Sequence, residues 1–287
     1  MSSNREKLVC TGERVIEDDY KASQSSYLIY LFHIATYRFC LPFVRNKRVL
    51  DFGCGSGYGT HLLSADCEQI TGIDISADAI AYAKDHYRKD NLDYLRVSNI
   101  EDESLPFEND TFDTVISFQV MEHIRLVDKY LSEIRRVLRK DGKLVIATPD
   151  RTTRLFPGQK PWNVYHVTEY SPSSFGALVR DFFPGTDLYG MSGRKDVLDI
   201  ERRRTRALRI STYLFTFPFC PEWYRQSMLR LLKYCDGLIG RFRKAGTTQD
   251  VQEQKYEFDV EDIQIEREVD ASVNIVSVST NTKTRSP

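Results

Sequence analysis

The chain has 287 residues, with 40 Lys and Arg against 41 Asp and Glu, so its net charge of −1 provides no overall attraction to nucleic acid or to a membrane surface. Its six cysteines are scattered without a C-x-x-C pair, which fits a reduced, cytoplasmic chain better than a disulfide framework or a zinc site. The first residues are polar and no run of about 18 apolar residues is present, so we expect neither a signal peptide nor a membrane-spanning helix.

The first ordered segment that we expect is an aromatic, amphipathic helix. A polar stretch over residues 1–24 is followed by S-Y-L-I-Y-L-F-H-I-A-T-Y-R-F-C-L, a helical pattern that Pro42 stops. We assign residues 1–45 to an N-terminal helical cover.

Residues 46–192 alternate short apolar strands with helices. One helix begins after Ser76 as its N-cap, and another runs over residues 126–142 and is closed by Gly142. Such alternation predicts βαβ crossovers and a mostly parallel sheet with helices on both faces. The predicted strands are K-R-V-L-D-F (47–52), Q-I-T-G-I-D-I (69–75), L-D-Y-L-R-V-S-N (92–99), T-F-D-T-V-I-S-F (111–118) and K-L-V-I-A-T-P (143–149).

Residues 193–255 form a predicted basic, aromatic helical insert between a sixth strand, at about residues 186–191, and a last strand at 271–280. Three interpretations stay open: a helical cap with its aromatic residues packed on the core, a substrate cap that rests on an anionic membrane surface and receives a lipid-linked sugar, and an RNA-binding segment. No RNA-binding module signature is present, so we do not expect a nucleic-acid partner. Residues 256–287 are expected to hold the return strand of the core and a disordered tail.

A glycine-rich loop, D-F-G-C-G-S-G-Y-G, follows the first predicted strand at residues 51–59. It has no lysine, which argues against a phosphate-binding P-loop. In a dinucleotide motif G-x-G-x-x-G that starts at Gly53, the third glycine is replaced by Tyr58. The carboxylate of Asp51 repels pyrophosphate but attracts a cationic ligand, which favours S-adenosylmethionine over NAD. The glycines let the backbone approach that ligand closely.

A second acidic residue supports an adenosyl ligand. Asp74 ends the second predicted strand 23 residues after Asp51, and an acid at about that spacing accepts hydrogen bonds from both ribose hydroxyls. Capping of the next helix is the alternative role for Asp74, but Ser76 is already placed for it.

Four segments together resemble class I S-adenosylmethionine-dependent methyltransferases: D-F-G-C-G-S-G, G-I-D-I-S, L-P-F-E-N-D-T-F-D-T-V-I-S-F-Q-V-M-E-H-I and E-I-R-R-V-L-R-K-D-G-K-L-V-I-A-T-P. The resemblance covers about residues 45–185. It implies a Rossmann-like three-layer α/β sandwich with a seven-stranded, mostly parallel sheet whose last strand is antiparallel, plus the helical insert. The segments T-G-E-R-V-I and N-V-Y-H-V-T-E-Y-S resemble a bacterial subgroup associated with cell-surface polysaccharide synthesis.

The resemblance also implies a cofactor site for S-adenosyl-L-methionine, with S-adenosyl-L-homocysteine as the product. Phe118 would face the methionine part, and Tyr37 of the first helix is expected to close over the cofactor. Asp74 would hold the ribose hydroxyls and Ile75 would lie against the adenine, with Asn99 and Ile100 near its amino group. The methionine and ribose pocket would be shaped by Asp51, Gly53, Cys54, Gly55, Gly57 and Tyr58.

Methyl transfer is an in-line displacement that gains from orientation, and a hydroxyl acceptor also gains from a general base. Candidate bases should follow the carboxyl ends of the strands. Glu122 and His123 follow the fourth predicted strand, and His166 and Glu169 follow the fifth. The sequence leaves open which of the two histidines is the base, and each could instead have a purely structural role.

Some relatives, including the ubiquinone-pathway O-methyltransferases, carry the motif E-x-x-E-H and bind a divalent metal. This chain has Q-V-M-E-H, in which Gln119 replaces the first glutamate. Glu122, His123 and His166 could still form a partial set, but the loss of a charged oxygen ligand weakens a site for a hard cation. We therefore expect no metal and a metal-free base.

These observations predict a methyltransferase that uses S-adenosylmethionine and acts on a hydroxyl of a sugar or surface-glycan precursor. A small-molecule methyltransferase for a natural product or a quinone is the alternative, and a non-catalytic S-adenosylmethionine-binding protein is the alternative of another class. We expect a cytoplasmic protein whose basic insert contacts the inner membrane face peripherally.

Overall fold

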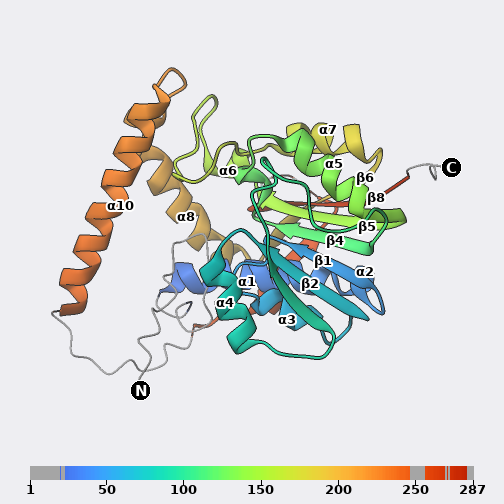
Figure 1. Ribbon diagram of the computed structural model, residues 1–287. Coiled ribbons are helices and arrows are strands. Elements are labelled where there is room, and N and C mark those ends of the chain that lie inside the picture. Colours follow the sequence, from blue (N-terminus) through green and yellow to red (C-terminus); the bar gives the residue numbers. More distant parts are fainter. Residues whose placement is uncertain (1–19, 21–22, 246–255, 269, 271, 283–287) are drawn as a thin grey trace.

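The computed structural model describes residues 20, 23–245, 256–268, 270 and 272–282, and its centre is one eight-stranded sheet (Figure 1). The order of the strands is β3-β2-β1-β4-β5-β8-β6-β7. The segment T-G-E-R-V-I and the last five residues of the predicted tail lie outside the described residues. The strands are β1 (Arg48–Phe52), β2 (Gln69–Asp74), β3 (Leu92–Arg96), β4 (Phe112–Phe118), β5 (Leu138–Pro149), β6 (Gly185–Gly193), β7 (Ile263–Glu266) and β8 (Asn274–Thr280).

The first five strands are parallel, and β8 pairs antiparallel with both β5 and β6. The predicted mostly parallel sheet with an antiparallel last strand is therefore confirmed. The predicted number of seven strands is wrong, because β7 adds an eighth strand antiparallel to β6 at the edge. This strand has four residues, I-Q-I-E, and only Ile263 and Ile265 alternate toward the core, which is too short a pattern to stand out in the sequence.

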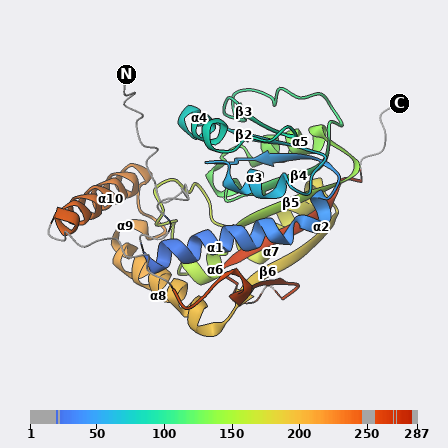
Figure 2. The ribbon, with the colours of Figure 1, turned by 90° about the horizontal axis from the view of Figure 1, so that it is seen from below.

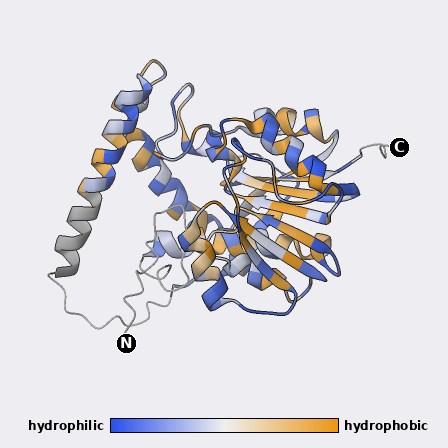
Figure 3. Ribbon diagram, viewed as in Figure 1, coloured by the Kyte–Doolittle hydropathy of each residue, from blue (hydrophilic) through white to orange (hydrophobic). Residues whose placement is uncertain are grey.

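Helices cover both faces of the sheet, so the molecule is a three-layer sandwich (Figures 1 and 2). Neighbouring strand residues point to opposite faces: Val49 packs with α1, α3 and α4, whereas Leu50 packs with α5 and α7. In Figure 3 the strands are accordingly the most hydrophobic part of the ribbon. The helices are α1 (Gln24–Phe39), α2 (Leu41–Val44), α3 (Tyr58–Leu63), α4 (Ala77–His86), η2 (Met121–His123), α5 (Val127–Val137), α6 (Arg151–Arg154), α7 (Pro172–Phe182), α8 (Lys195–Ser211), α9 (Tyr213–Thr216), α10 (Glu222–Ala245) and η3 (Val260–Asp262).

Local sequence explains most of the helix ends. The side chains of Ser23, Ser76 and Ser171 accept hydrogen bonds from first-turn backbone amides of α1, α4 and α7. As expected, α1 ends before Pro42, which lies in the first turn of α2.

The predicted closure of α5 by Gly142 is wrong. The helix ends at Val137, and β5 begins at once with Leu138, which pairs with Phe112. Asp141 then has a φ of +62° in an irregularity between the two strands. A Cβ on Gly142 would lie 2.9 Å from the backbone oxygens of Arg139 and Asp113. This glycine therefore permits a close approach of two backbone segments.

The insert forms a unit of α8, α9 and α10 to one side of the sheet, next to α1 in both ribbon views (Figures 1 and 2). Phe215, Cys220 and Leu229 form a small core of their own under this unit. Among the described residues, no helix is both long enough and apolar enough to span a membrane.

The strand order predicts where a ligand binds, at the carboxyl ends of the central strands. From β1 the chain adds β2 and β3 on one side, and β4 and β5 then follow on the other side. In open parallel sheets, ligands bind beyond the carboxyl ends of the strands where the order reverses, which is here between β1 and β4. The residues that follow these strand ends are those selected from the sequence.

Candidate functional site

The glycine loop joins β1 to α3, and its glycines serve different purposes. Gly53, Gly55 and Gly57 all have positive φ angles, of +83°, +55° and +86°. A Cβ on Gly55 would meet nothing within 4 Å, so the backbone here borders open space. A Cβ on Gly57 would lie 2.7 Å from the Cβ of Ala83 and 2.8 Å from the ring of Tyr94, so this glycine allows tight packing.

Asp51 lies behind the loop with only 1% of its surface exposed. Its Oδ2 accepts hydrogen bonds from the hydroxyls of Tyr37 (3.1 Å) and Thr60 (2.7 Å), and its Oδ1 has no partner among the described residues. Burial raises the pKa of this carboxyl to about 7, although the two hydroxyls oppose the shift. A buried carboxyl with one unsatisfied oxygen is suited to a cationic ligand.

Asp74 is fixed at the end of β2 by the backbone. Its Oδ2 accepts from the amide of Gly55 at 3.0 Å, and its Oδ1 accepts from the amide of Ser76 at 2.8 Å. Each carboxylate oxygen keeps a further lone pair for a ligand donor. The alternative role of Asp74, as the cap of α4, is filled by Ser76. The carboxylate of Asp74 therefore stays available for a ligand.

A cavity of about 1420 Å³ opens at the carboxyl ends of the parallel strands. Asp51 and Gly57 lie behind its wall and do not line it. The other ten predicted cofactor residues do line it: Tyr37, Gly53, Cys54, Gly55, Tyr58, Asp74, Ile75, Asn99, Ile100 and Phe118.

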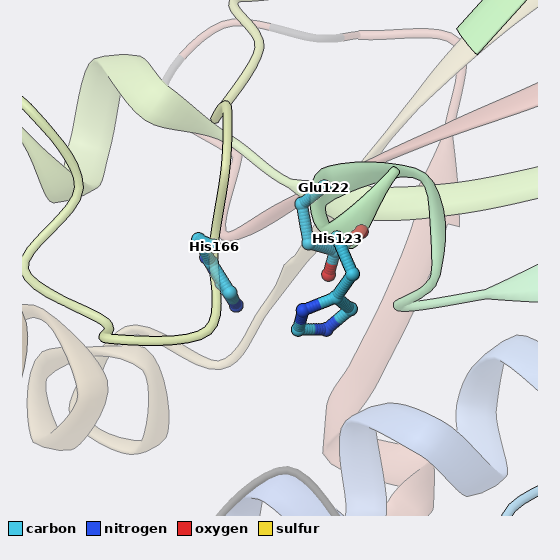
Figure 4. A group of neighbouring side chains, drawn as sticks. All are labelled: Glu122, His123 and His166. Carbon is cyan, nitrogen blue, oxygen red and sulfur yellow. The ribbon is translucent and has the colours of Figure 1, made fainter. Parts of the chain in front are cut away.

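The three predicted catalytic residues lie close together (Figure 4). Glu122 and His123 come from η2 after β4, and His166 comes from the loop after α6. One possible ligand atom from each lies within 4.8 Å of those of the others, and the two imidazole rings are nearly perpendicular with centroids 4.9 Å apart. His123 and His166 line the cavity, whereas Glu122 is fully buried and does not.

The hydrogen bonds of the two imidazoles fix their orientation. His123 donates from Nδ1 to the carbonyl oxygen of Tyr165 at 3.1 Å. His166 donates from Nδ1 to Oε1 of Glu169 at 2.8 Å. Because a carbonyl or a carboxylate can only accept, both Nδ1 atoms carry the proton, and Nε2 is the acceptor in the neutral ring.

Glu169 is itself held ionised by an arginine. Arg154 donates to both carboxylate oxygens of Glu169, at 3.0 and 3.2 Å, and all three side chains of this His166–Glu169–Arg154 series are buried. Burial alone would raise the pKa of Glu169, but the charge of Arg154 and the hydrogen bond from His166 lower it to about 2. His166 therefore lies against a permanent negative charge at neutral pH.

Glu122, His123 and His166 could also provide three ligands for a metal ion. The hydroxyl of Thr148 donates to Oε2 of Glu122 at 3.1 Å and orients it. Gln119, which replaces the first glutamate of the E-x-x-E-H motif, lines the cavity with a φ of +56°. The expectation of a metal-free site stays a prediction.

A second cavity of about 390 Å³ meets the first one at the histidine end. Its wall includes Ile29 of α1, Leu208 of α8 and Leu232 of α10, so the insert encloses it. Both cavities are lined by His33, Gln119, Val164, Tyr165 and His166.

Comparison with known proteins identifies the domain. Residues 43–184, about half of the chain, match the family model described as "Methyltransferase domain". This stretch is a class I methyltransferase domain. A Mycobacterium tuberculosis protein named "Probable S-adenosylmethionine-dependent methyltransferase" is 31% identical over 175 residues, which cover 61% of this chain and 60% of that protein. The ubiquinone biosynthesis O-methyltransferase of Glaesserella parasuis is 28% identical over 114 residues, covering 38% of this chain and 48% of that protein.

Solved structures support the fold of the methyltransferase domain. An S-adenosylmethionine-dependent methyltransferase of Thermotoga maritima superposes with a TM-score of 0.55 at 12% identity, covering 93% of this chain and 99% of that one. The [4+2]-cyclase SpnF superposes with a TM-score of 0.51 at 18% identity, covering 86% of this chain and 80% of that one. Because a cyclase shares the fold, the fold alone does not decide the reaction.

The sequence predictions of a Rossmann-like methyltransferase domain, of its enzyme class and of S-adenosylmethionine as its cofactor are confirmed at the level of the family. The match spans about three fifths of the length of the mycobacterial relative.

Sequence reasoning missed two groups of residues on the cavity walls. His33 of α1 lines both cavities, and its Nδ1 lies 2.8 Å from the hydroxyl of Tyr58. The first turns of α10 supply Glu222, Arg225, Gln226 and Arg230 to the larger cavity. Both groups come from helices that carry no motif and reach the site only through tertiary packing.

Proposed function

We propose that the protein transfers a methyl group from S-adenosylmethionine to a hydroxyl of a sugar or surface-glycan precursor. One observation carries the proposal: a single cavity runs from the Gly55 and Asp74 end of the domain to His166. A cofactor and an acceptor bound at the two ends of such a cavity would meet between them, as an in-line displacement requires.

The residues present fit this cofactor. The open space beside Gly55 allows a close approach to the backbone, and the carboxylate of Asp74 can accept from ribose hydroxyls. Asp51 acts through the wall of the cavity, with Tyr37 between its carboxylate and the open space. The bound cofactor would supply a methyl group activated by a positively charged sulfur. The four-part division of the chain at residues 45, 192 and 255 belongs to this proposal.

His166 is the proposed base. Its Nε2 accepts the proton of the acceptor hydroxyl, and its Nδ1 proton stays on Glu169, which stabilises the positively charged ring. His123 is oriented only by the neutral carbonyl of Tyr165 and is more exposed. These contacts support His166 rather than His123 as the base. Glu122, oriented by the hydroxyl of Thr148, is the third residue of the proposed catalytic group.

The acceptor end of the cavity is suited to a sugar. Glu222, Gln226 and Arg230 offer charged and amide groups that can bind several hydroxyls at once. These residues lie on α10 of the insert. Peripheral contact of the insert with a membrane is also part of the proposal, since it would bring a lipid-linked acceptor to this end of the cavity. A small-molecule acceptor is the second candidate, and the names of the ubiquinone biosynthesis relatives favour it.

The test follows label from methyl-labelled S-adenosylmethionine after incubation of the protein with a lysate of its source organism. The products are separated into lipid-extractable, polymeric and small aqueous pools. Asp74→Ala should abolish the label, whereas Asp78→Ala, which changes an exposed acid in the first turn of α4, should leave it unchanged.

Label in the lipid or polymer pool would support the glycan acceptor. Label confined to small aqueous products would overturn that acceptor in favour of a small molecule. Cofactor binding without any labelled product would favour a non-catalytic binding protein, and absence of cofactor binding would overturn the whole proposal.

A further inference from the structure

The insert has a charge opposite to that of the rest of the chain. Residues 195–245 contain twelve Lys and Arg but five Asp and Glu, which gives the segment a charge of +7. Since the whole chain has a net charge of −1, the other residues together carry −8. A segment of this kind is attracted to anionic surfaces even though the protein as a whole is not.

The same segment exposes large apolar side chains in one short stretch, formed by α9, the turn after it and the first turn of α10. The three most exposed large apolar side chains in the described part of the protein are Phe219 (90%), Leu214 (79%) and Trp223 (72%). Tyr213 and Tyr224 beside them are also exposed. We call these five residues, which fall between positions 213 and 224, the aromatic tip.

The exposure of the aromatic tip is not a failure of packing. Phe215 of α9 and Cys220 of the turn after it are buried and form the small core of the insert with Leu229. The fold therefore has an apolar interior available here, and other apolar side chains of the same stretch still point outward. The rings of Trp223 and Tyr224 are in contact, with centroids 5.9 Å apart. Exposed apolar side chains gathered in one short stretch of chain mark an interaction surface.

Basic residues extend from the aromatic tip along one face of α8. Arg203, Arg206 and Ile210 are all exposed and follow one another at spacings of three and four residues, so they share a face of the helix. This face of α8 ends at Ser211, and α9, which carries Leu214, begins two residues later. Arg230, two turns into α10, is exposed as well and lines the large cavity.

The aromatic tip lies next to the acceptor end of the large cavity. Trp223 and Tyr224 fall between Glu222 and Arg225, both of which line that cavity. In both ribbon views α10 stands at the outer side of the molecule, away from the sheet (Figures 1 and 2). A surface bound by the tip would therefore be close to the acceptor entrance.

We propose that the aromatic tip docks on an anionic lipid bilayer, with Phe219, Leu214 and Trp223 in the headgroup region. Arg203 and Arg206 would bind anionic headgroups beside them, since aromatic residues favour the membrane interface and basic residues its charge. An acceptor carried on a lipid would then enter the cavity beside α10, a consequence that rests on the proposed function.

Two other occupants fit the surface less well. Nucleic acid binds aromatic side chains by base stacking, and the aliphatic Leu214 and Ile210 offer no stacking partner. A second copy of the chain, paired symmetrically through the same patch, would bring two inserts of charge +7 together. An anionic bilayer satisfies both the apolar and the basic parts of the surface.

The experiment is co-sedimentation of the full-length protein with vesicles of phosphatidylcholine alone and with 30% phosphatidylglycerol. We expect binding to the anionic vesicles only, weakened by 0.5 M salt. Phe219→Ser/Trp223→Ser and Arg203→Glu/Arg206→Glu should each weaken binding roughly tenfold or more. The matched controls, Leu95→Ser/Leu126→Ser and Lys89→Glu/Lys140→Glu, change exposed residues elsewhere on the domain and should bind as the unaltered protein does.

Equal losses in the test and control variants would overturn the proposal, as would absence of sedimentation. A concentration-dependent dimer that the Phe219→Ser/Trp223→Ser variant abolishes, or tighter binding to single-stranded RNA than to the vesicles, would overturn it too. Cofactor affinity and label transfer are measured on the same samples. Loss of vesicle binding with transfer intact would reject only the docking, and vesicle binding without any transfer would reject only the proposed function.

Discussion

Nδ1 of His166 lies 2.8 Å from Oε1 of Glu169, three residues along the same loop, and both side chains are buried at the end of the large cavity. Glu169 is ionised because Arg154 binds it from the other side. The neutral ring of His166 is thus held in the one tautomer that presents Nε2 as a proton acceptor, which distinguishes it from a histidine that only fills space.

Replacement of His166 by Asn should reduce kcat by about 10²–10⁴-fold, the usual contribution of a general base. Cofactor affinity should stay within about twofold, because His166 lies at the acceptor end of the cavity. The measurement is label transfer into the acceptor pool, with calorimetry for the cofactor. His86→Asn, an exposed histidine of α4, is the control. A larger loss in His123→Asn than in His166→Asn would assign the base to His123 instead.

Glu169 is proposed as a positioning residue, and Glu169→Gln should reduce kcat by about 10–100-fold without a large change in KM. It should also destabilise the fold by about 3–5 kcal/mol, because it removes the principal partner of the buried Arg154. In the unaltered protein the lowered pKa of Glu169 contributes stability above pH 4.5, which is lost as the pH falls toward about 2. Urea unfolding between pH 2 and 7 measures this, and equal pH profiles for variant and unaltered protein would contradict it.

Asp51 should make stability depend on pH in the opposite direction. Burial raises the pKa of Asp51 from 3.8 to about 7, so between these values the folded state binds the proton and the unfolded state has lost it. The free energy of unfolding should therefore fall as the pH rises from about 4 to 7, by up to roughly 4 kcal/mol.

Asp51→Asn removes this dependence and should be more stable than the unaltered protein above pH 7 without cofactor. The cationic cofactor favours the carboxylate, so its affinity should rise with pH through about 7 in the unaltered protein and stay flat in the variant. Thermal unfolding and calorimetry at pH 5.5, 7 and 8.5 measure both effects. A variant that keeps the pH dependence would show that another group is responsible.

The sequence was most informative where the structure is local. Strand and helix alternation, the cap at Ser76 and the loop from Asp51 to Gly59 depend on neighbouring residues, and each is found where it was expected. The edge strand Ile263–Glu266 was missed because it has four residues and only Ile263 and Ile265 alternate toward the core, so no clear local pattern marks it.

The site shows the same limit. Ten of the predicted cofactor residues line the cavity, but Asp51 and Gly57 do not. Whether a residue of the loop lines the cavity or lies behind its wall depends on tertiary packing, which the sequence motif does not show. His33 and the α10 residues reach the cavity only because α1 and the insert pack over the crevice. The resemblance identified the chemistry, but it carried no information about the residues of α10, which lie outside the family match.

The fourth glycine of the loop can be tested by stability alone. A Cβ on Gly59 would overlap the ring of Tyr37, which packs from α1 onto α3, so Gly59→Ala should destabilise the protein by about 1–3 kcal/mol. Gly185→Ala is the matched control, because the nearest atom to its Cβ, in Thr280, is 4.0 Å away, and it should be nearly neutral. Thermal unfolding compares them. Equal stability of the two variants would mean that α1 does not hold Tyr37 in this position.

Removal of metal distinguishes two possible roles of Glu122, His123 and His166: a metal site, or a metal-free site in which His166 is the base. Their ligand atoms lie within 4.8 Å of one another, so a divalent ion could join them. A second carboxylate ligand is missing, however, since Gln119 stands where a carboxylate would strengthen a site for a hard cation. We expect protein treated with EDTA to keep its methyl transfer activity and its Tm, because a proton acceptor at His166 needs no metal.

Addition of Mg²⁺, Mn²⁺ or Zn²⁺ to the treated protein should change the rate by less than about twofold, and Gln119→Glu should create metal binding that the unaltered chain lacks. Calorimetric titration of each ion into both proteins measures this. If EDTA abolished transfer and one ion restored it, and if His166→Asn then lost that ion, the three residues would be metal ligands. The base would in that case lie elsewhere on the cavity wall, with His33 the first residue to replace.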